Sequence, residues 1–403
     1  MNNIKAVIGK SKPIGTISAP PSKSDAHRLL ICAALCKNQK CTIHGYYPSD
    51  DISATVDCIR TLGAKCEIDG EKITVTGCDL TKVKNVTLNC RESGSTLRFI
   101  IPLCMLCGNN ISITGSERLL SRPLDVYKII ADENGINFRI ENNILYINGK
   151  LNKNSFEIDS SVSSQFVTGL MLYSAVKGEK STIKINKAAS KPYIDMTAAV
   201  LKKFGVTAEI FDSEICIDGT LNAPDDVYVE GDWSGAAFFE ALNLIGGNVN
   251  VTGLDVNSAQ GDKIFSEIFN KDKIEQDISD CPDLAPIIMA VASVKNGCVL
   301  TGTRRLAYKE SDRRYSMAQE LSKFGIKTDI EDDRIIVQGG NLQRPKQTLE
   351  SHNDHRIAMS LAVLLTLTGG EINGVQCVKK SMPDFFEKLI SLGVEVICVE
   401  ADS

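Results

Sequence analysis

The 403-residue chain is long enough for two domains with sizeable cores, and its 43% hydrophobic and 24% charged residues are typical of a globular protein. Its net charge of −5 argues against a general nucleic-acid surface, so an anionic ligand must be bound by a local cluster of Lys and Arg. No apolar run approaches the ~18 residues that span a membrane, and the first residues lack the apolar stretch of a signal peptide. We therefore expect a cytoplasmic protein with no nucleic-acid or membrane partner.

The cysteines favour the same compartment. Fourteen of them are scattered through mostly apolar runs, which is typical of reduced and buried thiols. Cys104 and Cys107 have CxxC spacing, but they lie inside an apolar run without a second pair. We interpret them as core residues.

The first predicted helix follows a run of β character from Ile14 to Ala19. Its apolar residues recur at helical spacing and mark one buried face. Ser24 is the expected N-cap, so that Lys23 and Arg28 flank a first turn whose free N–H groups favour an anion. A plain capped helix has the same pattern, so this stretch alone does not establish a site.

One unit recurs along the chain. A short strand ending in a turn is expected at 42–45, 112–115, 183–186, 250–253, 299–302 and 371–374. A helix is expected to start before each strand, at Ser24, Ser95, Ser164, Ser234, Pro282 and Asp354. A second helix ends before Gly63, Gly135, Gly205, Gly325 and Gly393, and the fourth copy of this signal is missing. The pattern predicts six mixed α/β units with the fourth truncated, arranged either as a ring or as two groups of three.

Several helix starts carry more polar groups than a cap needs. Hydroxyl and amide groups gather at Ser163, Ser164, Gln165 and Ser190, which suits a hydroxylated, phosphorylated small molecule. Basic residues recur at equivalent ends of the units: Lys23, Arg28, Arg98, Arg118, Lys309, Arg313, Arg356 and Lys380. In a chain of negative net charge, these residues predict a basic pocket for a strongly anionic ligand. Asp283 and Glu310 are its candidate acid and base.

A metal site is not indicated. His352 and His355 have no third ligand nearby, and Arg356 beside them would repel a cation. We expect no bound metal.

With these motifs in place, the chain resembles the enolpyruvyl transferase family, most closely its EPSP synthase branch, over nearly its whole length. The matching segments are Ser22–Arg28, Gly94–Arg98, Arg118–Pro123, Val162–Phe166, Ser190–Asp195, Glu230–Asp232, Gln260–Asp262, Pro282–Asp283, Lys309–Arg313, Asn353–Arg356 and Lys380–Asp384. The resemblance implies two similar inside-out α/β domains, each of three βαβαββ-type repeats, with a cleft between them. It implies a first domain of residues 1–19 and 229–403 and a second of residues 20–228.

The implied reaction moves the enolpyruvyl group of phosphoenolpyruvate to the 5-hydroxyl of shikimate 3-phosphate and releases phosphate through a tetrahedral ketal. The resemblance implies that this reaction uses neither a metal nor an organic cofactor. This is a step of chorismate and aromatic amino acid biosynthesis and the target of glyphosate. By resemblance, shikimate 3-phosphate would be held by Lys23, Ser24, Arg28, Ser163, Ser164, Gln165, Ser190, Asp283 and Lys309. Phosphoenolpyruvate would be held by Lys23, Gly94, Arg118, Gln165, Arg313, Arg356 and Lys380. Asp283 would take the hydroxyl proton, and Glu310, with Lys23, would handle the methylene proton. We expect a monomer.

Two positions depart from the family pattern. The family usually has Asn where this chain has Glu92, and it often has Asn where this chain has Arg305.

The alternative within the family is a transferase that acts on UDP-N-acetylglucosamine and usually carries a reactive Cys in the loop matching 115–123. That loop contains no Cys here. A non-catalytic protein built on the same repeats would be expected to have lost the acid, the base or the phosphate ligands, and this chain has all three.

Overall fold

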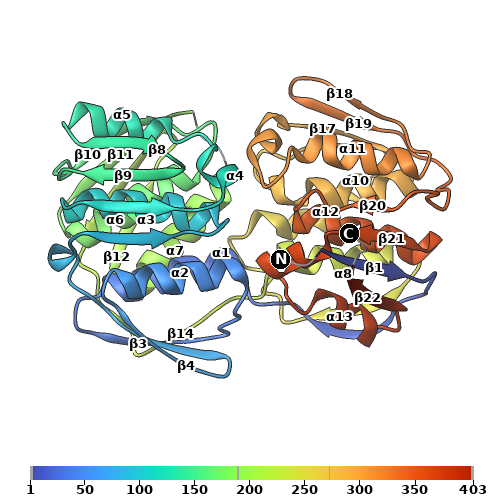
Figure 1. Cartoon of the computed structure of the whole chain (residues 1–403), viewed down its shortest axis with the longest axis horizontal. Helices are drawn as coiled ribbons and strands as arrows, with labels where there is room; N and C mark the ends of the chain where they lie inside the picture. The colour runs from blue at the N-terminus through green and yellow to red at the C-terminus, as the bar shows by residue number, and fades with distance from the viewer. Residues whose placement is uncertain (1–2, 188–189, 272, 401–403) are drawn as a thin grey trace. The chain divides into compact units, whose positions relative to one another are not determined.

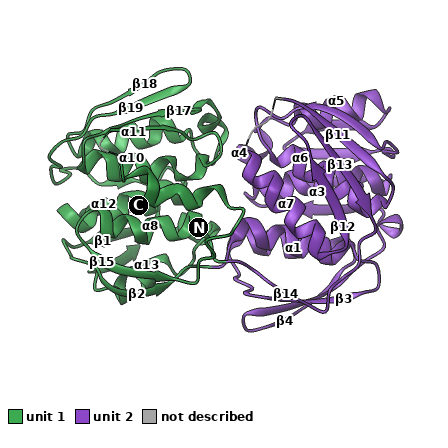
Figure 2. Ribbon diagram, turned by 180° about the vertical axis from the view of Figure 1, so that it is seen from behind, with its two compact units in different colours: residues 1–20, 231–403 green, residues 21–230 purple. Residues whose placement is uncertain are grey.

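The computed structural model describes residues 3–187, 190–271 and 273–400, and the chain forms two compact units (Figures 1 and 2). Unit 1 comprises residues 1–20 and 231–403, and unit 2 comprises residues 21–230. The domain boundaries expected from the resemblance fall after residues 19 and 228, and the compact units divide after residues 20 and 230.

Unit 2 contains three four-stranded sheets of one topology, in which the first two strands are parallel and the other neighbours antiparallel. Their strand orders are β14 (Asp226–Tyr228), β3 (Lys40–His44), β5 (Lys72–Thr76), β4 (Lys65–Asp69); β6 (Val86–Asn89), β7 (Ile111–Thr114), β9 (Ile144–Asn148), β8 (Asn137–Glu141); and β10 (Ser155–Asp159), β11 (Ser181–Lys187), β13 (Glu214–Gly219), β12 (Val206–Ile210). Side chains alternate between buried and exposed along most strands, so one face of each sheet packs on the core.

Three helices lie inside unit 2: α1 (Lys23–Leu35), α3 (Gly94–Cys107) and α6 (Gln165–Lys177). Eleven of the thirteen residues of α1 and twelve of the fourteen of α3 are buried. A helix that is buried on all sides must be apolar all round, which explains the uninterrupted apolar run of α3. The second helices of the repeats are α2 (Asp50–Thr61), α5 (Asp125–Glu133) and α7 (Lys191–Lys203), and a short α4 (Glu117–Leu120) precedes α5.

Unit 1 repeats this plan with two complete sheets and one reduced sheet. Their strand orders are β20 (Leu349–Glu350), β21 (Gly370–Asn373), β1 (Ile4–Ile8), β22 (Val396–Glu400); β16 (Ile274–Asp277), β17 (Cys298–Thr301), β19 (Arg334–Val337), β18 (Thr328–Ile330); and β15 (Asn248–Thr252), β2 (Ile14–Ser18). The inner helices are α8 (Trp233–Leu244), α10 (Ala285–Val294) and α12 (His355–Thr368). The other helical elements are α9 (Phe265–Ile268), α11 (Arg313–Lys323), α13 (Phe385–Ser391), η2 (Gly261–Ile264), η3 (Pro282–Leu284), η4 (Arg304–Tyr308) and η5 (Val375–Lys380).

The predicted repeats are confirmed. The six expected strands are β3, β7, β11, β15, β17 and β21, and each starts one or two residues earlier than its pattern. The glycines after the second helices have positive φ, from 65° at Gly135 to 107° at Gly63, which only glycine adopts without strain. The truncated fourth unit is also confirmed: within the described residues β15 pairs with β2 alone, and α9 has four residues.

For four of the six predicted helix starts the N-cap or the first helical turn lies elsewhere than expected. The N-cap of α1 is Ser22, not Ser24, because the extended Ser22 turns its Oγ to the N–H of Asp25 at 3.4 Å. In the same way Ser93 caps α3 and Asp232 caps α8, each two residues before the expected start. Pro282 begins η3, and α10 follows from Ala285. Ser164 and Asp354 hold the expected N-cap positions of α6 and α12.

Each unit has a hydrophobic core of its own. Cys104 and Cys107 are buried in α3, as predicted, and burial raises the pKa of the Cys107 thiol to about 12. All fourteen cysteines are free thiols. No helix in the described part of the chain is both long enough and apolar enough to cross a membrane.

Candidate active site

Asp283 lies at the centre of a cluster of charged side chains in unit 1. Its carboxylate accepts from Lys309 Nζ at 3.0 Å, Arg313 Nη1 at 2.9 Å and Arg356 Nη2 at 3.1 Å. Burial by itself favours a neutral acid, but the three cations outweigh it and hold the pKa of Asp283 well below its usual range. Asp283 is therefore an ionised carboxylate whose negative charge is shared among three donors.

The folding of three elements brings these groups together. Asp283 lies in the single turn η3, Arg313 begins α11, and Arg356 lies in the first turn of α12. The N-cap of α12, Asp354, accepts the backbone N–H of Arg356 at 2.9 Å and the Nε of Arg313 at 2.8 Å. One cap therefore orients both arginines. Asp354 was not among the residues expected from the sequence to form the site, because its capping role explained it fully.

Glu310 and Lys380 extend the cluster. Glu310 Oε2 accepts from Arg313 Nη2 at 2.7 Å, and Lys380 Nζ donates to the backbone carbonyl of Asn353 at 2.6 Å. Arg313 is only 1% exposed, and although burial opposes its charge, the carboxylates around it raise its pKa. Burial lowers the pKa of Lys309 and outweighs the opposing attraction of Asp283. All six residues that the sequence placed at this end of unit 1 thus meet: Asp283, Lys309, Glu310, Arg313, Arg356 and Lys380.

A further acid lies beside this cluster. Asp262, in η2, is 6% exposed, and its Oδ1 has no hydrogen-bond partner among the described residues. Burial, followed by the nearby charge of Asp283, raises the pKa of Asp262 to about 7. The sequence offered no signal for this, because Asp262 follows a glycine in an ordinary turn.

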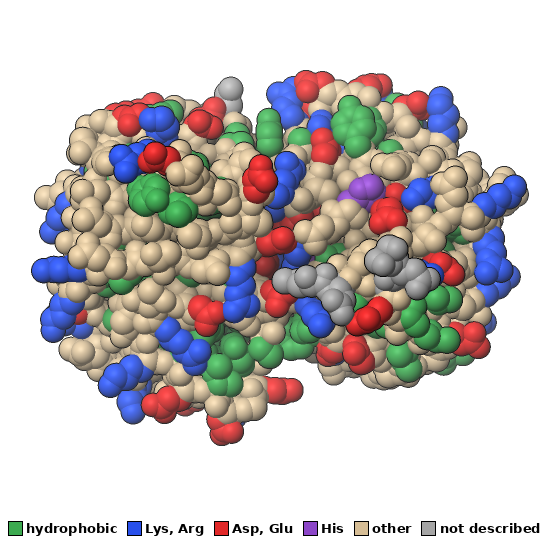
Figure 3. Space-filling model, in the orientation of Figure 1, with side chains coloured by type: hydrophobic (Ala, Val, Ile, Leu, Met, Phe, Trp, Pro, Cys, Tyr) green, Lys and Arg blue, Asp and Glu red, His purple; other side chains and the backbone are tan. Residues whose placement is uncertain are grey.

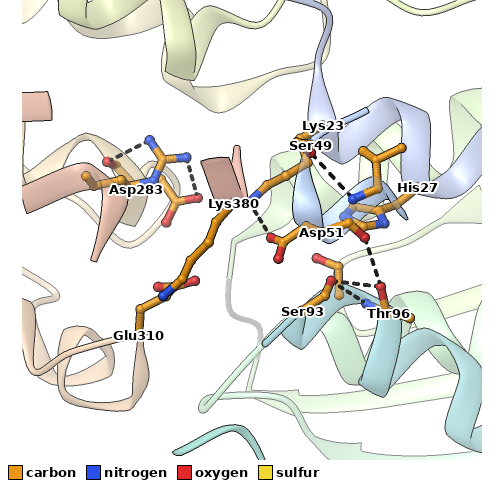
Figure 4. A network of polar contacts seen from close by, with 12 residues as sticks. Lys23, His27, Ser49, Asp51, Ser93, Thr96, Asp283, Glu310 and Lys380 are labelled. Atoms are coloured by element: carbon orange, nitrogen blue, oxygen red, sulfur yellow. Dashed lines mark hydrogen bonds and ion pairs between the residues drawn. The ribbon is translucent and has the colours of Figure 1, made fainter. Parts of the chain in front are cut away.

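In unit 2, Lys23 forms an ion pair with Asp51. Its Nζ lies 2.7 Å from Asp51 Oδ2, and the side chains are 17% and 10% exposed (Figure 4). Lys23 is the first residue of α1 and Asp51 lies in the first turn of α2. The sequence did not single out Asp51, since acidic residues in a first helical turn are common.

Gly94 lies against a group of side chains that bind anions well. A Cβ on Gly94 would lie 2.8 Å from Arg122 Nη1, 3.5 Å from Arg98 Nη1 and 3.7 Å from Gln165 Oε1. Arg98 Nη1 donates to Gln165 Oε1 at 2.8 Å, and Gln165 Nε2 donates to Ser95 Oγ at 3.0 Å. The first turn of α3 therefore presents free N–H groups and two buried guanidinium groups side by side.

The loop after β7 differs from the expectation. Arg118 was expected to bind phosphoenolpyruvate, but its side chain is exposed on α4. Arg122, four residues later, is 8% exposed and is the arginine of this loop beside Gly94. Both arginines are present in the sequence motif, but their spacing alone did not show which of the two side chains would be buried beside Gly94.

The hydroxyl groups expected at α6 and α7 occupy helix starts. Ser164 is the N-cap of α6, and Ser163 Oγ accepts the N–H of Gln165 at 3.2 Å. Ser190 precedes α7 in the left-handed conformation, with φ of 55°, and is 3% exposed. A non-glycine residue in this conformation is uncommon and marks a place where local geometry is constrained by its surroundings.

Arg28 is buried beneath these helix starts. Its guanidinium donates to Thr197 Oγ1 at 2.9 Å, Tyr193 O at 3.1 Å and Ser24 O at 2.6 Å. It also lies over the ring of Phe99, 5.1 Å from the centroid. Burial lowers the pKa of Arg28 to about 10, so it stays charged at neutral pH.

The two departures from the family pattern have different surroundings. Glu92 is half-buried, directly before the Ser93 that caps α3. Arg305, in η4, donates through Nη2 to the backbone carbonyl of Ser279. His352, one of the two histidines considered for a metal site, pairs through Nε2 with Glu320 Oε1 at 2.9 Å. No cluster of three metal-ligating side chains occurs in the described ranges.

Charges of both signs are interspersed over the face of the molecule in Figure 3. The clusters around Asp283 and around Gly94 therefore owe their character to buried groups and not to the net charge of the surface.

Comparison with known proteins decides the family. The family model described as EPSP synthase (3-phosphoshikimate 1-carboxyvinyltransferase) matches residues 8–389. The chain belongs to the EPSP synthase family. It is therefore a transferase enzyme.

Relatives share nearly the full length. Proteins named 3-phosphoshikimate 1-carboxyvinyltransferase from Clostridium novyi and Clostridium kluyveri are 36% and 37% identical, and the alignments cover 98% and 96% of this chain and 98% and 97% of theirs. The EPSP synthase structure from Acinetobacter baumannii has a TM-score of 0.78 at 22% identity, covering 98% of this chain and 100% of that one. The enolpyruvyl transferase NikO from Streptomyces tendae has a TM-score of 0.77 at 15% identity, with both chains fully covered. These two structures confirm the predicted fold class.

Proposed function

We propose that this enzyme transfers the enolpyruvyl group of phosphoenolpyruvate to the 5-hydroxyl of shikimate 3-phosphate and releases phosphate. The observation that carries the proposal is the Asp283 carboxylate held by Lys309, Arg313 and Arg356 at 2.9 to 3.1 Å, in a chain of the EPSP synthase family. Both substrates are strongly anionic, and this cluster offers cations together with a carboxylate that can accept a proton.

Asp283 is proposed as the base that takes the proton of the attacking hydroxyl. With three cations around it, its pKa is too low for efficient proton transfer. Bound phosphate and carboxylate groups would share the positive charge of Arg313 and Arg356. Less of that charge then stabilises Asp283, so its pKa rises toward that of a useful base. Substrate binding itself would activate the carboxylate.

The proposed ligands are those that the family resemblance implies. For phosphoenolpyruvate they are Lys23, Gly94, Arg118, Gln165, Arg313, Arg356 and Lys380, and the position of Arg122 beside Gly94 supports adding it to this set. For shikimate 3-phosphate they are Lys23, Ser24, Arg28, Ser163, Ser164, Gln165, Ser190, Asp283 and Lys309. Burial of Arg28 and Arg313 supports strong contacts with anions, because charge interactions strengthen where water is excluded.

Glu310 is proposed to move the methylene proton, with Lys23 assisting. Its Oε2 contacts Arg313 at 2.7 Å, so the carboxylate is held in place by a proposed phosphoenolpyruvate ligand. The tetrahedral intermediate forms when a proton adds to the methylene carbon, giving a methyl group, and the hydroxyl oxygen attacks the neighbouring carbon. It breaks down when the methyl group loses a proton and phosphate leaves, which restores the enol double bond. As proposed, these steps need no metal and no organic cofactor.

The test is phosphate release from phosphoenolpyruvate by the purified enzyme. We expect release that requires shikimate 3-phosphate and yields the enolpyruvyl ether. Release that requires UDP-N-acetylglucosamine, or that needs no acceptor, would contradict the proposal. The absence of a cysteine in loop 115–123 supports the first outcome.

We further propose that the enzyme acts as a monomer in the cytoplasm. Fourteen free thiols, nearly all buried or half-buried, support a reducing compartment. Light scattering after gel filtration would give the mass in solution, and a value of twice 43.8 kDa would overturn the monomer.

A further inference from the structure

Two side-chain contacts join helices α1 and α2 one helical turn apart. Lys23 Nζ lies 2.7 Å from Asp51 Oδ2, and His27 Nδ1 lies 2.7 Å from Thr55 Oγ1. Residues four apart share one face of a helix, so both helices present matching pairs. The first contact is a partly exposed ion pair, whereas His27 and Thr55 are both 0% exposed.

The inner contact continues into helix α3. Thr55 Oγ1 lies 2.6 Å from Thr96 Oγ1, and Thr96 Oγ1 donates to Ser93 Oγ at 2.7 Å. Ser93 is the N-cap of α3 and accepts the backbone N–H of Thr96 at 3.2 Å. A hydrogen-bonded chain of four buried side chains therefore links α1, through α2, to the residue before Gly94 (Figure 4). We call it the hydroxyl chain: His27, Thr55, Thr96 and Ser93.

The direction of these hydrogen bonds follows from the proton count. A threonine hydroxyl has one proton, so when Thr96 donates to Ser93 it must accept from Thr55. Thr55 then accepts from His27, which makes Nδ1 the protonated nitrogen of the ring. Nε2 is left without a proton, in agreement with its lack of a hydrogen-bond partner among the described residues. A buried acceptor without a partner is tolerated better than a buried donor.

His27 is suited to a fixed role. Burial, together with the charges of Lys23 and Arg28, lowers its pKa well below 6.5, so the ring is neutral at physiological pH. The contact between α1 and α2 then does not change with pH in the working range. Nothing in the proposed chemistry uses this histidine as an acid or base.

We propose that His27 and Thr55 are positioning residues, which through the hydroxyl chain hold the first turns of α1 and α3 in the register that phosphoenolpyruvate requires. This inference rests on the proposed function, because it takes Lys23 and Gly94 as ligands of that substrate. Lys23 starts α1 four residues before His27, and Gly94 starts α3 directly after Ser93. A shift between these helices would therefore change the position of Lys23 relative to Gly94.

The primary test compares Thr55→Val with Thr55→Ser. Valine keeps the shape of threonine but cannot form either hydrogen bond, whereas serine keeps the hydroxyl. We expect Thr55→Val to lower kcat/KM for phosphoenolpyruvate by about tenfold or more, since small misplacements of ligands have effects of this size. Thr55→Ser should stay within about twofold of the wild type, and affinity for shikimate 3-phosphate should fall less than that for phosphoenolpyruvate. Equal kinetics for the two variants would overturn the proposal.

Two controls separate positioning from general destabilisation. Thr61→Val makes the same change on an exposed face of α2, where the hydroxyl bonds only within the helix, and should leave the kinetics unchanged. Ile59→Val weakens the buried face of α2 without touching the hydroxyl chain. If Ile59→Val, at a similar fall in Tm, raised KM for phosphoenolpyruvate as much as Thr55→Val, the effect would be merely structural and the proposal would fail.

A second pair of variants covers the case in which Thr55→Val does not fold. His27→Asn places a polar atom near the position of Nδ1, and His27→Leu does not. We expect the asparagine variant to retain more kcat/KM for phosphoenolpyruvate than the leucine variant, and the reverse order would contradict the proposal. A wild-type enzyme that releases no phosphate with shikimate 3-phosphate would instead refute the proposed function, so the two failures are distinguishable.

Discussion

The charge on Asp283 shows how single residues determine what this site can do. One carboxylate touches three cations, and its pKa is lowered well below the usual range. Sequence spacing predicted the members of this cluster, but not which cation contacts which oxygen. These contacts determine the strength of the base. A carboxylate that is strongly stabilised as an anion accepts a proton poorly until its cationic partners also bind the anionic groups of the substrates.

Asp283→Asn should therefore abolish proton transfer without removing the binding cations. We expect kcat to fall by about 10² to 10⁴, the usual contribution of general base catalysis. Shikimate 3-phosphate should still bind detectably in titration calorimetry, because its other proposed ligands, among them Lys309 and Arg28, remain. A kcat near that of the wild type would remove Asp283 from the mechanism.

Arg122 and Arg118 give a matched pair within one loop. Arg122 is buried beside Gly94, whereas Arg118 is exposed. We expect Arg122→Gln to raise KM for phosphoenolpyruvate by about tenfold or more, as is typical for loss of a buried charged contact, and Arg118→Gln to change it less. Steady-state kinetics at saturating shikimate 3-phosphate measure both values. The opposite order would restore Arg118 as the ligand.

Asp262 links stability to pH. Its pKa rises from 3.8 to about 7 on folding, so between these two pH values the folded state holds a proton that the unfolded state has lost. This group's contribution is fully present below pH 3.8 and is lost as pH rises through 7. The wild type should lose this contribution when the pH rises from 5 to 8, and Asp262→Asn should not. The free energy of unfolding of the variant, relative to that of the wild type, should therefore increase over this range by on the order of 1 kcal/mol or more. Urea unfolding at both pH values measures this, and a pH-independent difference would show that Asp262 is ionised in both states.

Helix starts are the elements from which the site is built. Lys23, Gly94, Gln165, Arg313 and Arg356 each lie in the first turn of a helix, where free N–H groups favour anions. The repeat places these turns at equivalent positions. The N-caps of α1, α3 and α8 lie two residues before the expected residues, since the sequence offers more than one residue able to cap each of these helices.

The cap of α1 can be tested directly. Ser22 is fully buried and its Oγ accepts the N–H of Asp25, so Ser22→Ala should lower the free energy of unfolding by about 1 kcal/mol. Ser24→Ala is the matched control, because Ser24 already lies inside the helix, and it should change stability by less than about 0.5 kcal/mol. Chemical denaturation compares the two. Equal losses would mean that the helix start is not set by Ser22.

At the scale of the whole molecule, the two units differ in how the chain builds them. We propose that they are the domains. Every strand of the three sheets of unit 2 comes from residues 21–230. Unit 1 needs the N-terminus as well, because β1 lies between β21 and β22, and β2 is the partner of β15.

A fragment of residues 21–230 should therefore fold alone. It contains one complete hydrophobic core, and we expect a cooperative thermal transition by circular dichroism. Residues 231–403 alone should lack this transition, because two of their sheets miss a strand, and joining residues 1–20 to their end through a flexible linker should restore it. A fragment 21–230 without cooperative unfolding would mean that unit 2 depends on the rest of the chain.

Much of this protein was determined by the sequence alone. Apolar periodicity, glycines with positive φ and the recurring strand made the six units and the truncated fourth one predictable, because these signals are local. The motifs also predicted which charged residues meet around Asp283, since each lies at the same end of its repeat. Only the tertiary structure decided the contacts between elements that are separate in the sequence: the pairing of Lys23 with Asp51, the choice of Arg122 over Arg118 beside Gly94, the buried acid Asp262 and the hydroxyl chain. These features join residues that are distant in the chain, and their burial and pKa shifts arise from packing that no local pattern encodes.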